Sequence, residues 1–136
     1  MEQQIDNIRP TNNLQSEGAK QELTLIPKSE KYIQYMLDVM IKLPKTERYS
    51  IGTEYKSSMY QMLENIMYIS KIDTYERLPI INKIDAELNT QRIFLRIMTK
   101  NRWIDEHKCK VAMDLIYEIG KIVGGLVKYY GKNCKK

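Results

Sequence analysis

The sequence predicts an all-α protein that folds as an up-and-down antiparallel four-helix bundle. Three observations indicate this class. In four separate stretches apolar residues recur every three or four positions, which is the spacing of one face of an α-helix. The breaks between these stretches are short and contain residues that end or begin helices. No stretch has the composition of a strand bounded by turns. Helices joined by short corners pack as antiparallel neighbours.

The first helix is predicted from Ser29 to Leu43. Ser29 is a candidate cap, and Pro44 ends the helix because it lacks an amide proton and disfavours the α conformation at Leu43. The apolar stripe consists of Ile33, Met36, Leu37, Met40 and Ile41.

The segment before this helix, residues 1–27, is predicted to be a flexible acidic arm. It is rich in Asn, Gln and Glu, has no sustained periodicity, and holds two basic and four acidic residues. Leu23, Leu25 and Ile26 are the part of the arm expected to pack on the body. The remaining chain divides into a four-helix bundle over residues 28–131 and a basic tail over residues 132–136.

The second helix is predicted over about residues 51–72. Ser50, Gly52 and Thr53 are each acceptable at its start, and the sequence does not choose among them. Its stripe consists of Ile51, Tyr55, Met59, Met62, Leu63, Ile66, Met67 and either Ile69 or Ser70. Asp73 and Thr74 offer the next break.

The third helix is predicted over about residues 74–100, with Pro79 near its start, where a missing amide is tolerated. Its stripe consists of Ile81, Ile84, Leu88, Leu95 and Met98, with Gln91 between them. Ile80, Ile93, Phe94 and Ile97 widen this apolar face. A helix that is apolar on more than one side is usually buried on more than one side, so we expect a second partner surface here.

The fourth helix is predicted from Asp105, a candidate cap, to about Tyr130, with Gly131 as its stop. Gly120 and Gly124 lie on one face and allow another helix to approach closely. The predicted stripe is Lys108, Val111, Ala112, Leu115, Ile119, Ile122, Val123 and Leu126, while Met113 and Ile116 are expected to point elsewhere.

The sequence offers no constellation for catalysis. His107 is the only histidine, no Glu-x-x-His pair is present, and Cys109 and Cys134 are too few for a zinc site or a disulfide scaffold. The glycine-rich run at residues 120–125 has no strand before it, so a phosphate-binding loop is a weak interpretation. We therefore expect a protein without catalytic residues, metal or cofactor, and a metal-dependent or hydrolytic enzyme is the least favoured class.

Location follows from two further absences in the sequence. The first residues lack the basic and apolar regions of a secretory signal, and the longest apolar runs are only a few residues long. We therefore expect a cytoplasmic protein that does not span a membrane.

Positive charge is the feature that points to a partner. The formal net charge is +5, and residues 28–136 hold 20 basic and 13 acidic residues. Lys45 and Arg48 lie in the first corner beside Tyr49. Arg92, Arg96 and Lys100 follow one another at a spacing of four, Arg102 comes next, and Lys110, Lys121, Lys128 and Lys132 recur in the fourth helix. This pattern suits the phosphates of a nucleic acid. The alternative is a solvated face that is paired internally with Asp85, Glu87 or Glu118.

Residues at four places together carry a resemblance. They are Leu43, Pro44, Lys45, Arg48, Tyr49, Ile51 and Gly52 at the corner; the long helix with Ser57; Arg92, Leu95 and Arg96; and Ile119, Gly120, Lys121, Gly124 and Gly125. In this combination, over about residues 30–131, the chain is similar to the accessory variability determinant proteins. These are the small four-helix-bundle partners of the reverse transcriptase in diversity-generating retroelements. They are related to bundle proteins encoded in intervening sequences of bacterial ribosomal RNA. One departure is Leu126, which stands where family members often have tryptophan.

The resemblance implies properties that the helix periodicity does not. It implies a homopentameric barrel with a basic surface that binds template RNA and cDNA with little sequence preference. It also implies a partnership with the reverse transcriptase in mutagenic retrohoming. By position it assigns nucleic-acid binding to Lys45, Arg48, Arg92 and Arg96, and Lys100 and Arg102 extend that set. The alternative is a four-helix protein–protein interaction module, resembling the ribosomal intervening-sequence proteins, without a nucleic-acid role.

Overall fold

The computed structural model describes the backbone of residues 13–133 and the side chains of residues 21–132. Its four long helices are α2 (Asn13–Met40), α4 (Ile51–Ile69), α5 (Arg77–Lys100) and α6 (Glu106–Asn133). A short helix, α3 (Lys45–Arg48), lies between α2 and α4, and a 3-10 turn, η1 (Thr74–Glu76), precedes α5. Within these residues there is no strand, which confirms the predicted all-α class.

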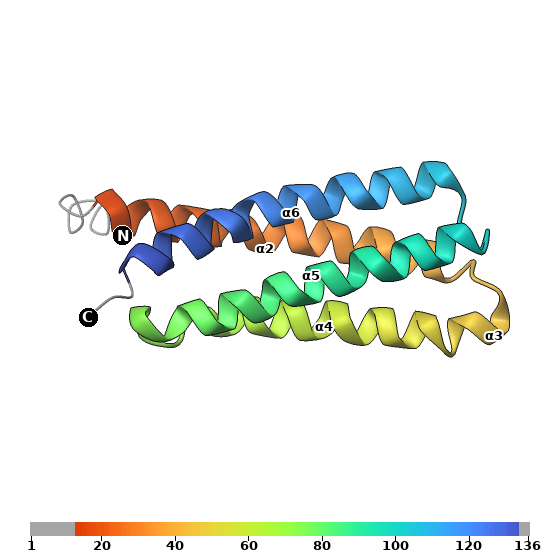
Figure 1. Ribbon diagram of the computed structural model, residues 1–136, viewed down its shortest axis with the longest axis horizontal. Coiled ribbons are helices and arrows are strands. Elements are labelled where there is room, and N and C mark those ends of the chain that lie inside the picture. Colours follow the sequence, from red (N-terminus) through yellow and green to blue (C-terminus); the bar gives the residue numbers. More distant parts are fainter. Residues whose placement is uncertain (1–12, 134–136) are drawn as a thin grey trace, which may run out of the picture.

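The helices form a closed bundle of four. Each of α2 and α5 packs against both α4 and α6, and successive long helices run in opposite directions (Figure 1). This arrangement is the predicted up-and-down four-helix bundle. In the described part of the chain no helix is long and apolar enough to cross a membrane.

The first helix begins earlier than predicted. It starts at Asn13 and continues through Pro27, so the predicted start at Ser29 is wrong and residues 13–27 of the predicted arm are helical. Ser29 is a buried residue inside the helix rather than its cap. Residues 1–12 of the predicted arm lie outside the described residues.

Contacts with distant segments explain why helix α2 continues through a proline. The Glu22 carboxylate accepts hydrogen bonds from the Tyr130 hydroxyl and from Arg77 Nη1, the latter at 3.3 Å. Leu25 is fully buried, and Pro27 itself faces solvent. A proline inside a helix costs about 3 kcal/mol. The burial of Leu25, which the sequence predicted to pack on the body, and the hydrogen bonds of Glu22 offset this cost. The hydrogen bonds of Glu22 are not visible in the local sequence.

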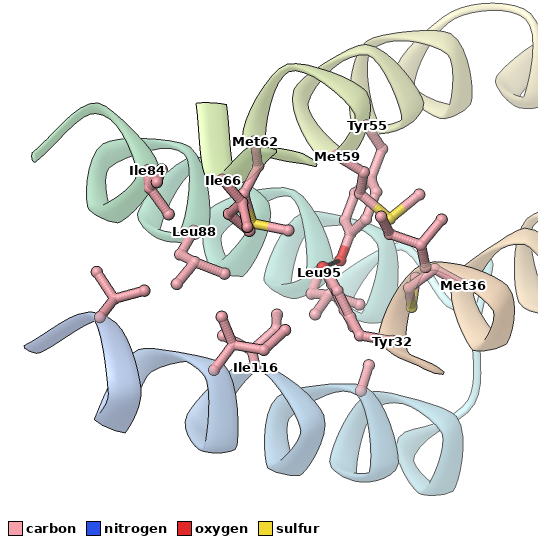
Figure 2. Packing of buried hydrophobic residues seen from close by; sticks show 14 of the residues in the cluster. Tyr32, Met36, Tyr55, Met59, Met62, Ile66, Ile84, Leu88, Leu95 and Ile116 are labelled. Atoms are coloured by element: carbon pink, nitrogen blue, oxygen red, sulfur yellow. Dashed lines mark hydrogen bonds between the residues drawn. The ribbon is translucent and has the colours of Figure 1, made fainter. Parts of the chain in front are cut away.

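The core is built from the inner faces of all four long helices (Figure 2). On α5 the predicted residues Ile81, Ile84, Leu88, Gln91, Leu95 and Met98 are all buried. Three other predictions are wrong. Ile41 and Met67 are exposed by 63% and 50%, and Ile116 is completely buried. On α6 the predicted residues Ala112, Ile119, Val123 and Leu126 are buried, and Ile116 joins them while Leu115 is half-buried.

A chain of hydrogen bonds crosses this core from α2 to α5. Figure 2 shows Tyr32 of α2 and Tyr55 of α4 pointing toward one another, and their hydroxyl oxygens are 2.5 Å apart. The Tyr32 hydroxyl donates to Gln91 Oε1 at 2.7 Å, so the proton between the two tyrosines belongs to Tyr55. Gln91 Nε2 donates to Ser58 Oγ at 3.0 Å, and Ser58 Oγ donates to Glu87 Oε1 at 2.6 Å. The chain thus ends on a carboxylate at the surface.

The helix ends follow the predicted signals in part. Helix α4 begins after Ser50, but the Ser50 hydroxyl donates backward to Thr46 O at 3.2 Å and makes no cap. Asp105 does cap α6, because its Oδ1 accepts the amide of Lys108 at 2.8 Å, which lowers the pKa of Asp105. Helix α6 continues to Asn133, so Gly131 is not its stop.

Candidate nucleic-acid interface

The corner cations lie at one end of the bundle. Helix α3 carries Lys45 and Arg48, and Figure 1 places α3 at the end where α5 finishes and α6 begins. Lys45 is exposed and Arg48 is half-buried. The buried Arg48 Nε has no hydrogen-bond partner among the described residues. A buried donor without an acceptor is costly, and an incoming anion would satisfy it.

Arg92, Arg96 and Lys100 lie along one side of α5, and Arg92 reaches helix α6. Arg92 Nη2 lies only 2.9 Å from the position that a Cβ at Gly120 would occupy, so the missing side chain of Gly120 makes room for the guanidinium. Arg92 Nη1 also donates to Asn89 Oδ1 at 2.5 Å. These contacts hold Arg92 along the α5–α6 boundary, while Arg96 and Lys100 are exposed.

Arg102 sits at a strained backbone position. Its φ is 64°, the only positive value outside glycine among the described residues. The Arg102 amide donates to Thr99 O and the Trp103 amide donates to Met98 O, both at 2.9 Å. This is the hydrogen-bond pattern that ends helices at a left-handed residue, a position glycine normally fills. An arginine at this position therefore destabilises the fold by about 1 kcal/mol or more relative to glycine.

The structure places four of the six predicted cations at the same end of the bundle. Lys100 and Arg102 line a surface hollow of about 520 Å³ together with Asp105 and Glu106, at the end that also carries α3. Arg96 lies one helical turn before Lys100 in α5. Arg92 lies two turns before it, about 12 Å from Lys100 along the helix axis.

The predicted cations have no ion-pair partner among the described side chains. The four ion pairs found there are Lys28–Glu118, Arg77–Glu22, Lys108–Asp105 and Lys110–Asp114. Glu118 thus pairs with Lys28, and Glu87 accepts the hydroxyl of Ser58. For these two carboxylates the structure does not support the alternative of internal pairing with the predicted cations.

Helix α6 adds an exposed aromatic residue, Tyr117, next to a further cation, Lys121. The Tyr117 side chain is 61% exposed, and the Lys121 ammonium lies 5.5 Å from the centre of its ring. Tyr117 and Lys121 are four residues apart, and this spacing places two side chains next to each other on a helix.

Fold and surface together define a small all-helical bundle protein with a line of unpaired cations. In the described part of the chain, no group of His, Cys, Asp or Glu side chains could hold a metal ion. The chain belongs to the bAvd-like family, whose match covers residues 23–130. This match fits the resemblance that the corner and glycine motifs suggested.

The fold recurs among solved structures, of which we describe one. It is a protein of unknown function from the S23 ribosomal protein family of Bacteroides thetaiotaomicron. It matches with a TM-score of 0.73 at 13% sequence identity, over 79% of this chain and 98% of that chain. At this identity the likeness concerns the fold alone. No curated protein matches the chain.

Proposed function

We propose that this protein is a non-enzymatic accessory factor of a diversity-generating retroelement. In this role it binds RNA and DNA through its basic surface and partners the reverse transcriptase during mutagenic cDNA synthesis and retrohoming. Membership of the bAvd-like family supports the class of system. The observation that carries nucleic-acid binding is the set of six cations, Lys45, Arg48, Arg92, Arg96, Lys100 and Arg102, none of which has an ion-pair partner among the described residues.

The mechanism we propose is electrostatic. Unpaired cations on a rigid bundle attract phosphates without reading bases, and each neutralised phosphate releases counterions. Assembly into a homopentamer multiplies this field and holds template RNA and cDNA near the polymerase. Arg48 adds a buried Nε donor that lacks an acceptor.

The test reverses the charge of two arginines and compares a matched control. Arg92→Glu with Arg96→Glu changes the candidate interface, and Lys31→Glu with Lys83→Glu makes the same charge change at exposed positions outside it. Binding to labelled RNA and duplex DNA is measured across a salt series, with the oligomer mass measured on the same samples. We expect the arginine variant to lose affinity and to show a shallower salt dependence, while the lysine variant keeps most of both.

Two outcomes would refute the proposal. One is RNA binding and cDNA synthesis that survive in the folded arginine variant. The other is a wild-type protein that binds no nucleic acid at low salt.

A second candidate function is a protein–protein interaction module. It is favoured by Ile93 and Ile97, which are exposed by 46% and 41% on the outer side of α5. Under this alternative the neighbouring genes would lack a reverse transcriptase and a near-repeat that differs at adenines. Inspecting those genes separates the two functions at little effort.

A further inference from the structure

We propose that this protein binds single-stranded nucleic acid in preference to duplexes, because Tyr117 stacks on one of the unpaired bases. This inference rests on the proposed function and names the class of nucleic acid. The site is the α5–α6 face, which we define as Arg92 and Arg96 of α5 with Tyr117, Lys121 and Lys128 of α6.

The spacing of residues on α6 creates the outer part of this face. Tyr117, Lys121 and Lys128 follow at intervals of four and seven, so they lie on one side of the helix. All three are exposed. Gly124 lies between Lys121 and Lys128 in the sequence and has no atom within 4 Å of the position of a Cβ, so the surface beside these two lysines is open.

The register between α5 and α6 brings the arginines to the same place. Arg92 lies against Gly120. The two helices run antiparallel, so Arg96, one turn later in α5, reaches the level of the residues one turn earlier in α6 (Figure 1). Tyr117 is three residues before Gly120. The ring therefore has Arg96 at its own level across the helix boundary and the Lys121 ammonium 5.5 Å from its centre.

The ring is the part of this face that can distinguish single strands from duplexes. Cations bind the phosphates of both forms. In a duplex the faces of the bases are covered by their neighbours, whereas an unpaired base can stack on an exposed aromatic side chain. A nucleotide whose base lies on Tyr117 can therefore place its phosphate near Lys121 or Arg96.

Tyr117 differs from Tyr49, Tyr60 and Tyr68, which are also exposed, because a cation lies over its ring. Two cation–ring contacts occur among the described residues, and the second joins Arg77 to Tyr130, which is buried in the core. Tyr60 and Tyr68 are exposed on α4, with no cation over either ring in the described part of the chain. Tyr117 thus combines exposure with an adjacent cation, the combination found in proteins that bind single strands.

The experiment compares four probes with the full-length protein. They are a single-stranded DNA, a single-stranded RNA of the same length, an abasic DNA that keeps the phosphates, and a DNA duplex. We expect Tyr117→Leu to weaken binding to both base-containing single strands by about tenfold. Binding to the abasic strand and the duplex should be unchanged. The control Tyr68→Leu removes an exposed tyrosine from α4 and should alter none of the four.

A second variant gives a direct signal of stacking. In Tyr117→Trp we expect the new indole fluorescence to be quenched by the single strands and not by the abasic strand, relative to wild type with Trp103 alone. An equal loss on all four probes in Tyr117→Leu, or no loss, would overturn the inference while leaving the proposed function in place. A wild-type protein that binds none of the probes would instead refute the proposed function itself.

Discussion

The direction of the hydrogen bonds in the core predicts an asymmetry between two tyrosines that touch. Tyr55 donates to Tyr32, and Tyr32 donates to Gln91. Changing Tyr32 to phenylalanine therefore leaves two buried groups without a hydrogen-bond partner, the Tyr55 hydroxyl proton and Gln91 Oε1. Changing Tyr55 to phenylalanine removes the Tyr55 hydroxyl itself, and Gln91 Oε1 keeps its partner because Tyr32 still donates to it.

The magnitudes follow from the cost of unsatisfied groups. A buried polar group without a partner costs about 1–3 kcal/mol, so the two groups left by Tyr32→Phe should lower the free energy of unfolding by about 2–6 kcal/mol. Tyr55→Phe loses one hydrogen bond, worth about 1 kcal/mol. With a urea m-value of about 2 kcal/mol/M, Tyr32→Phe lowers the unfolding midpoint by about 1–3 M and Tyr55→Phe lowers it by about 0.5 M.

The assay is urea unfolding followed by circular dichroism at one protein concentration, with Tyr60→Phe as an exposed control. The double variant Tyr32→Phe with Tyr55→Phe provides the sharpest comparison. It removes the Tyr55 hydroxyl that has no acceptor in Tyr32→Phe. The double variant should therefore be more stable than Tyr32→Phe alone, although it carries one more change. Equal effects of the two single changes would refute the assigned direction of the hydrogen bonds. A double variant less stable than Tyr32→Phe would also refute it.

Three further predictions concern local features. Pro27→Ala should restore a helical hydrogen bond in α2 and raise the free energy of unfolding by about 1–2 kcal/mol, measured by the same urea titration; a loss of stability would show that the proline suits this position. Arg102→Gly should relieve the backbone with φ of 64° and stabilise by about 1 kcal/mol while weakening RNA binding; unchanged affinity would remove Arg102 from the interface. Burial raises the pKa of Tyr130 from 10.0 to about 12. Its contribution to stability is therefore present below pH 10 and lost as the pH rises to 12, and an ultraviolet titration should show this phenol ionising late; Tyr130→Phe is the control.

The core could be predicted well from the sequence because helix periodicity is a local property. Each residue of the α5 stripe is buried, including the polar Gln91, whose place between apolar neighbours marked it. The apolar pattern of α6 was too broad to fix its centre. Leu115 and Ile116 are both apolar, and packing against α2 and α5 together decides that Ile116 is the one fully buried.

The extension of α2 could not be predicted, because the deciding contacts are far apart in sequence. Pro27 is a strong local signal against a helix, while Glu22 meets Tyr130 only after the whole bundle has formed.

The same limit applies to the candidate interface. Spacing identified the line from Arg92 to Lys100, but the contact of Arg92 with Gly120 depends on the register between two helices. The left-handed backbone of Arg102 gave no signal, because glycine is the usual residue there.

The placement of the helix ends has a practical consequence for engineering. Helix α2 begins and α6 finishes at the same end of the bundle, opposite to α3 and to residues 101–105 (Figure 1). A fluorescent protein or affinity tag joined directly before α2 or after α6 would therefore be attached at the end opposite to Lys45, Arg48 and Arg102. A linker between the two termini would also permit a circularly permuted chain opened within residues 101–105. Such a chain would keep every helix whole and bring a new terminus next to the corner cations, where a crosslinker could capture the partner.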